Sequence, residues 1–577
     1  MVDEEKRTNE ALDASKKYNT VVEEANDYIE HFDILETITN VGNDEVFTPR
    51  KTCDMMLDSL PEEVWHNPLY KWLNPATKNG IFEREIALRL DKGLENVITD
   101  KEERRKHILQ NMIFSIGQTK FTSNVARRTL YYCSQANRKC DGLKASDGHY
   151  VNGYAIGNGS WFNDEEGNIK TPCTEHKINP RTKKCEFCGI AHDSKYLDAN
   201  QRETYAYEFI HVNKGLSLSI HLSKRFFGGD RNMKFDIIIG NPPYQLADGG
   251  GMNGVSARPI YHKFVEQAIS LNPKYLCMII PSRWMTGGKG LDDFRDSCLK
   301  DKRFKVVHDY ENDKEIFPTA DIGGGVMYFL WERDHNDMLD YYVHKDGKVI
   351  KDRRYLSTGE GIVIRDFFAS KIMEKIDHSK SFASIVSARR PFDLGADIFK
   401  KNPELFREKR EKDFDILFYG WDGVPMSKYI KNSCIKNKKL AESYKVFISK
   451  TGDPYFRNGR VNKQILRMPF FGERNTACSE TYLTIGCFEN RYEVDSILKY
   501  IATKLFRFLV LQKKKTQNVS RDVFEFVPLL DFTNHSIIDW SKSVEEINKQ
   551  LYDIFNLTNE EREYVETMID DFRNEGE

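Results

Sequence analysis

The sequence lacks the long apolar runs and the leader segment that mark membrane and secreted proteins. No stretch approaches the roughly 18 uninterrupted apolar residues of a membrane-spanning helix, and the mean hydropathy is −0.60. The first residues, MVDEEKRTNEALDASKKYN, are polar and acidic and contain no apolar core of a signal peptide. We therefore expect a cytoplasmic protein with no membrane partner.

A strong net charge and an even set of cysteines are also missing. The 86 basic and 88 acidic residues give a net charge of −2, which excludes a globally basic nucleic-acid-binding protein and leaves room only for local basic patches. The 11 cysteines are an odd number. Without a signal peptide, they predict reduced thiols or metal ligands rather than disulfides.

What the sequence does contain is a regular alternation of strands and helices. Short apolar segments such as KWLNPAT and KFDIIIG are each followed by a turn and a helical pattern, which predicts a doubly wound α/β domain with a parallel sheet over residues 41–345. Residues 1–40 read as a charged helical segment. A Cys-rich insertion at 133–200 lacks periodicity, and residues 346–577 are expected to form an α+β domain with C-terminal helices.

The turn Asn241-Pro242-Pro243-Tyr244, which directly follows the buried strand at 235–239, carries the strongest chemical signal. Ligands of doubly wound sheets collect at the carboxyl ends of strands, where this turn would lie. The prolines stiffen the turn and hold two acceptors, the Asn241 side-chain oxygen and the Pro242 carbonyl. Two such acceptors suit both hydrogens of an exocyclic amine such as adenine N6, and would aim its nitrogen at an electrophilic methyl group. The Tyr244 ring offers a stacking surface for a flipped base; the alternative is a turn that merely caps a strand.

With this motif the sequence resembles the gamma-class adenine-N6 DNA methyltransferases of restriction–modification systems. Their cofactor motif, DPACGSGxF, corresponds to NPATKNGIF at residues 74–82, with an asparagine in place of the leading acid and a lysine in place of an inner glycine. The resemblance implies a Rossmann-like fold, S-adenosylmethionine (SAM) as methyl donor, and a prokaryotic or phage origin. It also implies a SAM site formed by the following residues: Thr48, Pro49, Asn74, Ala76, Gly80, Phe82 and Asn241.

Two further parts of the family pattern concern the target base and the ribose of SAM. The segment EIFPTADIGGGVMYFLW matches the family element whose phenylalanine packs against the extruded base, which would be Phe317. As an aromatic residue beside a proline, Phe317 is equally well explained as core. The second cofactor motif usually ends in an acidic residue for the ribose, but FSIGQTK offers Gly117 or Gln118 and no acid. The ribose ligand stays unassigned.

The Cys-rich insertion predicts a structural zinc site. Cys185-Glu186-Phe187-Cys188-Gly189 is a CxxCG knuckle, a tight turn in which two thiolates meet one zinc ion. His176 and Cys133 are the expected further ligands, with Cys140 and Cys173 as competitors for the fourth place. A segment without a hydrophobic core needs such a staple; the alternative is a group of scattered reduced cysteines.

The C-terminal half carries the basic clusters that a DNA-binding region needs. Residues 428–467 contain eleven Lys or Arg residues and two acidic residues, with interleaved aromatics, and a second basic run begins at Lys504. These clusters predict phosphate contacts, and Gln517 could read base edges. The residues expected to bind DNA are Lys438, Lys439, Lys513, Lys514, Lys515 and Gln517.

We therefore predict a site-specific adenine-N6 methyltransferase acting on duplex DNA. Two alternatives stay open: a non-enzymatic DNA-binding subunit with a degenerate SAM site, and an Asn-Pro-Pro-Tyr methyltransferase acting on RNA. A protein-glutamine methyltransferase is disfavoured because such enzymes are much shorter. No PD…(D/E)xK nuclease pattern is evident, so a restriction activity, if present, is expected on a separate subunit.

Overall fold

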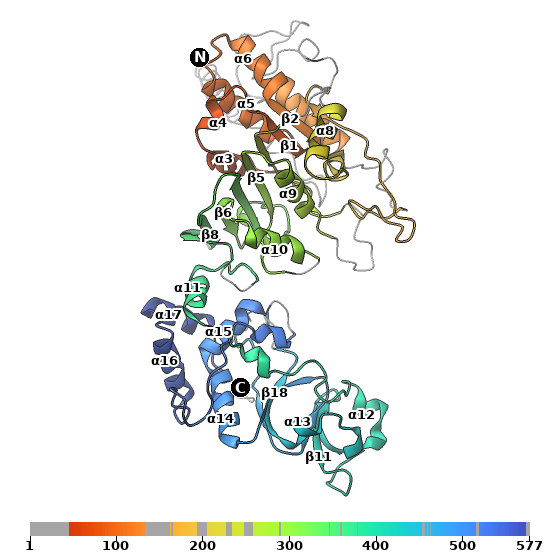
Figure 1. Cartoon of the computed structure of the whole chain (residues 1–577), viewed down its shortest axis with the longest axis vertical. Coiled ribbons are helices and arrows are strands. Elements are labelled where there is room, and N and C mark those ends of the chain that lie inside the picture. The colour runs from red at the N-terminus through yellow and green to blue at the C-terminus, as the bar shows by residue number, and fades with distance from the viewer. Residues whose placement is uncertain are drawn as a thin grey trace, which may run out of the picture. The chain divides into compact units, whose positions relative to one another are not determined.

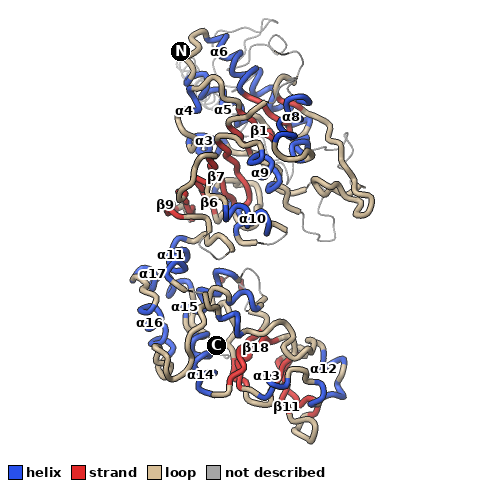
Figure 2. Tube along the Cα trace, viewed as in Figure 1, coloured by secondary structure: helices blue, strands red, loops and turns tan. Residues whose placement is uncertain are grey.

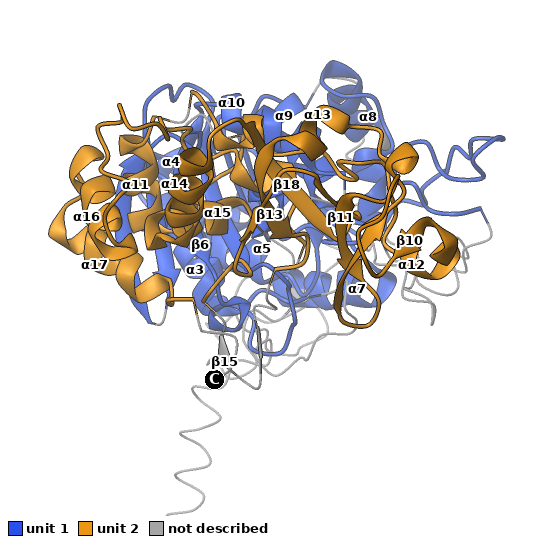
Figure 3. Cartoon of the chain, turned by 90° about the horizontal axis from the view of Figure 1, so that it is seen from below, with its two compact units in different colours: residues 1–357 blue, residues 358–577 orange. Residues whose placement is uncertain are grey.

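A computed structural model describes the chain in fourteen stretches, which divide between two units, residues 1–357 and 358–577 (Figure 3). The described residues are 46–132, 162, 166–192, 205–226, 233–246, 258–287, 290–345, 347–357, 361–377, 379–452, 456–457, 460–461, 463–514 and 518–572. The predicted helical segment at 1–40 lies outside them.

The first unit is built on a nine-stranded sheet with the order β3-β2-β1-β4-β5-β7-β6-β8-β9. Its strands are β1 (Trp72–Thr77), β2 (Ile113–Gly117), β3 (Ile169–Lys170), β4 (Ile237–Gly240), β5 (Tyr275–Pro281), β6 (Phe304–Tyr310), β7 (Val326–Glu332), β8 (Leu339–Lys345) and β9 (Lys348–Arg354). Every residue of β1, β2, β4 and β5 is buried, as expected for central strands covered on both faces. These strands therefore form the core of the unit.

Helices and helical turns flank this sheet (Figures 1 and 2). They are α3 (Arg50–Asp58), α4 (Glu63–His66), α5 (Ile81–Gly93), α6 (Lys101–His107), η1 (Ile108–Met112), α7 (Lys120–Arg127), η2 (Arg128–Tyr132), η4 (Tyr205–Ile210), α8 (Leu216–Phe226), α9 (Tyr261–Ser270), η5 (Ser282–Met285), α10 (Asp292–Lys300) and η6 (Asp313–Glu315). The strand order reverses between β1 and β4, whose parallel carboxyl ends lie side by side. This is the position at which a doubly wound sheet opens a ligand crevice.

The predicted parallel pairing holds for β3-β2-β1-β4-β5, but the sheet as a whole is mixed. β7 runs antiparallel to both β5 and β6, and β9 runs antiparallel to β8. A parallel connection needs a crossover, usually a helix. The connection from β6 to β7 contains only the three-residue turn η6, so the chain returns in the opposite direction.

Strand pairing bears on two of the predicted segments. The predicted domain end at 345 falls inside the β8–β9 hairpin, and the first unit continues to Ser357. The predicted insertion at 133–200 contains β3, which pairs with β2 at the edge of the main sheet. A two-residue strand carries too little hydrophobic pattern to be recognised in a sequence.

The second unit contains smaller sheets and a set of helices. Its strands are β10 (Phe406–Arg407), β11 (Ile416–Trp421), β12 (Pro425–Ile430), β13 (Tyr444–Ser449), β14 (Phe456–Arg457), β15 (Arg460–Val461), β16 (Phe470–Gly472), β17 (Thr476–Cys478) and β18 (Tyr482–Phe488). They pair as β10-β12-β11-β17, β16-β13-β18 and β14-β15. Its α-helices are α11 (Phe367–Lys375), α12 (Ile398–Lys401), α13 (Lys438–Glu442), α14 (Arg491–Ala502), α15 (Lys504–Lys513), α16 (Val544–Ile554) and α17 (Asn559–Met568).

Two hydrophobic cores stabilise the second unit. The larger joins α11 and α14–α17 to β13 and β18, and the smaller lies around β10–β12, β17 and α13. Among the residues that the structure describes, no helix is both long enough and apolar enough to cross a bilayer.

Candidate functional site

Side chains on β1, α5 and the neighbouring strand β2 hold the ends of the β1–α5 loop together. Asn74 donates to Glu83 Oε1 at 2.9 Å, and its Oδ1 accepts from the Ala76 amide at 3.1 Å. Ser115, on the neighbouring strand β2, also donates to Glu83 Oε1 at 2.7 Å. Burial raises the pKa of Glu83. The leading asparagine therefore pairs with an acid nine residues later, which sequence reasoning did not single out.

Gly80 is fixed by backbone conformation and by packing. It has φ = +80°, and a Cβ at this position would lie 2.8 Å from the Cα of Ala126 in α7. A side chain is thus excluded by α7 as well as by the left-handed backbone. Ala76 on β1 and Phe82 on α5, the other predicted members of the cofactor motif, are both buried.

The Asn241 side chain lies at the carboxyl end of β4, next to this loop. A Cβ at the preceding residue, Gly240, would lie 2.5 Å from Asn74 Oδ1, which shows how closely the two segments approach. Asn241 Nδ2 donates to the Val46 carbonyl at 3.0 Å and to Thr48 Oγ1 at 3.1 Å. Asn241 is 2% exposed, and its Oδ1 has no hydrogen-bond partner among the described residues. The predicted Thr48 and Asn241 are therefore in direct contact, and a buried acceptor is left over. Pro49, adjacent to Thr48, precedes α3 as its N-cap.

Lys78, which replaces a glycine of the family pattern, reaches into the same place. Its Nζ donates to the Val46 carbonyl at 2.8 Å and lies 5.9 Å from the centre of the Tyr244 ring. The side chain is 6% exposed. In the sequence this lysine is a departure from the motif. In the structure its side chain extends from the β1–α5 loop to Val46 and Tyr244.

Tyr244 and Phe317, which the sequence analysis separately assigned to the target base, contact each other in a covered position. Their ring centres are 6.5 Å apart and nearly perpendicular, and Tyr261 makes a similar contact on Tyr244. Tyr244 is 5% exposed and Phe317 is 2% exposed, so neither ring face is open to solvent here. Burial raises the pKa of Tyr244, so its hydroxyl is neutral at physiological pH.

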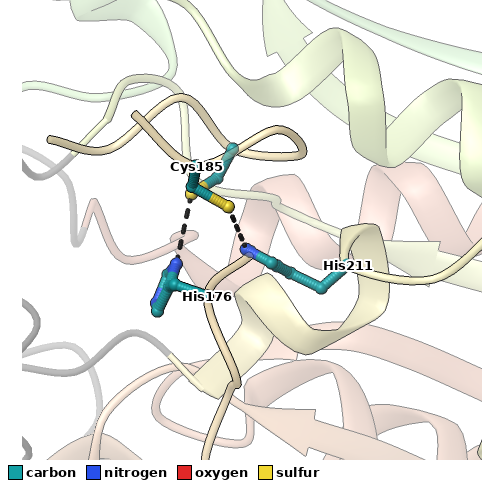
Figure 4. Close-up of side chains that lie close together, drawn as sticks. His176, Cys185 and His211 are labelled. Carbon is teal, nitrogen blue, oxygen red and sulfur yellow. Dashed lines mark hydrogen bonds between the residues drawn. The ribbon is translucent and has the colours of Figure 1, made fainter. Parts of the chain in front are cut away.

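A second group of side chains has the composition of a metal centre. Ligand atoms of His176, Cys185, Cys188 and His211 all lie within 4.8 Å of one another. Cys185 Sγ is 3.3 Å from His211 Nε2, and Cys188 Sγ is 3.5 Å from His176 Nδ1 (Figure 4). Tetrahedral zinc, with Zn–S of about 2.3 Å and Zn–N of about 2.0–2.1 Å, would separate sulfur from nitrogen by about 3.5 Å. The donor set and its spacing therefore fit zinc.

The surroundings of His211 and Cys185 match those of metal ligands. His211 Nδ1 hydrogen-bonds to the Tyr207 carbonyl, which leaves Nε2 facing the sulfur, as in metal-bound histidines that donate their other nitrogen to a backbone carbonyl. Hydrogen bonds from Cys188, His176 and His211 lower the pKa of Cys185, opposing the effect of its burial. The thiolate form is thereby favoured at Cys185, whereas the hydrogen bond between the two cysteines, together with burial, raises the pKa of Cys188.

The fourth member of this cluster differs from the predicted one. His211 occupies the place that the sequence assigned to Cys133, which lies outside the described residues together with Cys140. Cys173 and His192 are described but exposed, and neither belongs to the cluster. The sequence analysis did not include His211 because this residue follows the predicted insertion at 133–200.

The predicted DNA-binding lysines fall into three groups. Lys438 and Lys439 are exposed on α13. Lys513 forms an ion pair with Glu525 within the unit; its assignment to DNA stays a prediction, which this ion pair opposes. Lys514 reaches Gly452, where a Cβ would lie 3.0 Å from its Nζ. The remaining two, Lys515 and Gln517, lie outside the described residues.

A groove of about 890 Å³ opens in the second unit, close to Lys514. It is lined by Tyr419, Trp421, Pro425, Met426, Ser427, Ser449, Thr451, Arg467, Met468, Pro469, Phe470, Thr481 and Tyr482, and we call it the aromatic groove. Trp421 is 41% exposed and Met468 57% exposed. The described lining residues supply aromatic faces, hydroxyl groups and one guanidinium, and none of them is a carboxylate.

Comparison with known proteins gives one family and one curated relative. A family model described as Eco57I restriction-modification methylase matches residues 111–317. An uncharacterized adenine-specific methylase of Mycoplasma pneumoniae (strain ATCC 29342 / M129 / Subtype 1) is 45% identical over 361 residues, which are 60% of this chain and 83% of that protein.

Solved structures of restriction-modification enzymes are more distantly similar. The type IIL enzyme MmeI in complex with DNA is 11% identical, with a TM-score of 0.37, and the match covers 90% of this chain and 70% of that one. A nuclease-deletion mutant of the type ISP enzyme LlaGI, bound to a DNA substrate mimic, is 12% identical, with a TM-score of 0.39, over 88% and 47%. A type I restriction-modification complex gives 12% identity and a TM-score of 0.30 over 54% and 47%. The chain spans about half the length of the chains matched in the last two.

Proposed function

Because the chain belongs to the family of adenine-specific restriction-modification methylases, we propose that Asn241 directs the transfer of a methyl group from SAM to adenine N6 in duplex DNA. The observation that carries this proposal is the orphaned acceptor: Asn241 Oδ1 is buried and has no partner among the described residues. A buried acceptor without a donor is costly, and the N6 amino group of an extruded adenine supplies the missing donor.

The hydrogen bonds around Asn241 decide which atom of its amide meets the base. Nδ2 is held by the Val46 carbonyl and Thr48 Oγ1, so Oδ1 is the atom that remains for N6. The Pro242 carbonyl is the second acceptor of the pair. Together they bind both N6 hydrogens and stabilise the positive charge that develops on N6 as it forms its new bond to the methyl carbon. This electrostatic stabilisation is strong in a site that excludes water. SAM, when bound, supplies an electrophilic methyl group on a sulfonium.

The residues at the carboxyl ends of β1 and β4 are of the chemical types that would bind the cofactor. Asn74, Ala76, Gly80 and Phe82 would hold SAM from the side of the β1–α5 loop. Gly80 is the N-cap of α5 in a left-handed conformation, so the amino-terminal end of this helix, the positive end of its dipole, follows β1 closely. Thr48, Pro49 and Asn241 would close the site from the other side.

Tyr244 and Phe317 are proposed to hold the flipped adenine. Both rings are buried against each other here, so entry of the base requires one of them to move. A base between two aromatic faces is retained by stacking, worth about 1–3 kcal/mol per base in single-strand complexes. The covered arrangement is thus the closed state of the base pocket.

We further propose that His176, Cys185, Cys188 and His211 bind one structural zinc ion. Four protein ligands would leave no open coordination position, which distinguishes a structural from a catalytic site. The ligand spacing and the Tyr207 contact of His211 support this assignment.

For the second unit we propose DNA recognition. Lys438, Lys439 and Lys514 would contact phosphates, and Lys515 and Gln517 remain proposals from sequence. The aromatic groove supports this role, because the Arg467 guanidinium and the hydroxyl groups that line the groove suit hydrogen bonds to base edges. None of its described lining residues is a carboxylate that would repel phosphate. Restriction activity would reside on a separate chain.

Mass spectrometry of digested nucleic acid tests the proposed reaction. Purified protein with labelled SAM should place N6-methyladenine in duplex DNA at one recurring sequence, and sequencing of DNA from expressing cells should map that sequence. Label found in RNA alone would favour the RNA alternative, and SAM that neither binds nor reacts would favour a non-enzymatic subunit.

A further inference from the structure

The cluster of His176, Cys185, Cys188 and His211 touches the two elements that hold Tyr244 in place. Lys263, on α9, donates its ammonium to the Phe187 carbonyl, which lies between Cys185 and Cys188. On the other side of the same knuckle, a Cβ at Gly189 would lie 4.0 Å from Leu246 Cδ1. The knuckle therefore contacts both α9 and the chain that follows the Asn-Pro-Pro-Tyr turn.

Those two elements are joined to each other at Tyr244. The Ile260 amide donates to the Tyr244 carbonyl at 3.1 Å, and the Leu246 amide donates to the Arg258 carbonyl at 3.0 Å. Tyr261, the first residue of α9, makes the edge contact on the Tyr244 ring. The position of α9 thus decides where the Tyr244 ring lies.

The His211 side of the cluster is attached to the same helix. Gln267 of α9 is 3% exposed and donates to the Phe209 carbonyl at 3.1 Å and the Val212 carbonyl at 2.8 Å, on either side of His211. The segment also reaches the cofactor side of the sheet, because the Tyr205 amide donates to the Gln118 carbonyl at 2.8 Å. Knuckle and histidine therefore approach α9 from different parts of the chain.

We propose that the ion bound by these four ligands positions α9, and through it Tyr244, so that the metal controls retention of the target base without touching it. The proposal rests on the proposed function. One ion bound by the knuckle and His211 would join two separate loops into a single support for the helix. Contiguous packed and hydrogen-bonded contacts are the physical route for such an effect. Lys263 and Gln267 are the positioning residues.

Lys263→Met tests the link without changing a ligand. We expect about one equivalent of zinc and unchanged SAM affinity. Retention of the base, read from 2-aminopurine fluorescence at the target position, and single-turnover methylation should both fall roughly 10- to 100-fold, as for other residues that orient a metal-linked group. Lys263→Arg, which keeps a donor, should restore both, and Lys224→Met, at an exposed lysine of α8, is the matched control. Full base retention in folded Lys263→Met would overturn the proposal.

His211 variants and hydrogen exchange keep the result readable if activity is lost for another reason. His211→Ala should lose the ion and reproduce the base-retention defect. His211→Cys, which keeps a metal ligand, should keep the ion and normal retention of the base. Hydrogen exchange at residues 261–270 should accelerate when zinc is chelated from the full-length protein. If exchange at α9 is unchanged on metal removal, the link is absent even if methylation fails. If α9 responds but wild-type protein does not methylate adenine, the proposed function fails and the structural link stands.

Discussion

The side-chain amide of Asn241 donates to Thr48 Oγ1 over 3.1 Å, although the two residues are 193 positions apart in the chain. This contact, with that to the Val46 carbonyl, orients the amide so that its oxygen is the atom left for the substrate. The early segment at 46–49 is therefore part of the proposed catalytic geometry, as well as a border of the proposed cofactor site.

Replacing Asn241 by alanine should slow methyl transfer by about 10²–10³-fold, the cost of one preorganised partner of developing charge. DNA affinity should hardly change, because phosphate contacts elsewhere dominate it. Single-turnover methylation and filter binding measure the two quantities. Thr48→Val should give a smaller loss and Thr48→Ser almost none. An Asn241→Ala enzyme of normal turnover would leave the turn as a strand cap.

Replacing Tyr244 by alanine should weaken retention of the flipped base and slow turnover, because it removes a stacking surface worth about 1–3 kcal/mol. Tyr244→Phe should be mild, since the Tyr244 hydroxyl has no hydrogen-bond partner among the described residues. Fluorescence of 2-aminopurine at the target position reports the first effect. Equal base retention in the alanine and phenylalanine variants would contradict the stacking role.

Lys78→Met should weaken SAM binding by roughly tenfold, which corresponds to about 1.4 kcal/mol. The change keeps most of the apolar stem but removes the donor to the Val46 carbonyl, so the 46–49 segment loses an anchor to the β1–α5 loop. Calorimetric titration with SAM measures the effect, and Lys51→Met, at an exposed lysine of α3, is the control. Unchanged affinity would make Lys78 a bystander.

Charge reversal at Lys438 and Lys439 should weaken DNA binding and reduce the slope of log K against log salt by about 0.9 for each lost phosphate contact. Lys513→Glu should leave that slope unchanged, because Lys513 already pairs with Glu525. Binding isotherms at several salt concentrations compare them. A larger change of slope for Lys513 than for the α13 pair would reverse the assignment.

Acid should destabilise the first unit through His262. Burial lowers the pKa of His262 to about 4, so between its ordinary value near 6.5 and pH 4 the unfolded chain binds more protons than the folded one. The free energy of unfolding therefore falls as the pH is lowered through this window, by roughly 1–2 kcal/mol at pH 5. His262→Gln should flatten this dependence in denaturant titrations, and exposed His535→Gln should not. Identical pH profiles for both variants would remove His262 as the cause.

The sequence determined the chemistry of this protein, because that chemistry is carried by short contiguous motifs. A buried strand followed by Asn241-Pro242-Pro243-Tyr244, a loop with Gly80 before a helix, and the Cys185–Cys188 knuckle each combine residue types and spacings that can be recognised locally. The α/β alternation followed from hydrophobic period in the same way. Phe317 was placed by family pattern, and the structure brings it onto Tyr244.

Only the tertiary structure decided which distant groups meet. His211 joins the knuckle from a segment 23 residues after Cys188, and Thr48 reaches Asn241 across the sheet. Charge counted along the chain does not show the surroundings of each lysine, for the same reason: Lys513 pairs with Glu525, and Lys445 is fully buried, donating to the Ala441, Glu473 and Thr476 carbonyls. Local spacing sets which chemistry is possible, but long-range packing selects the partner of each ligand, acceptor and charge, and that selection is not encoded in any short segment.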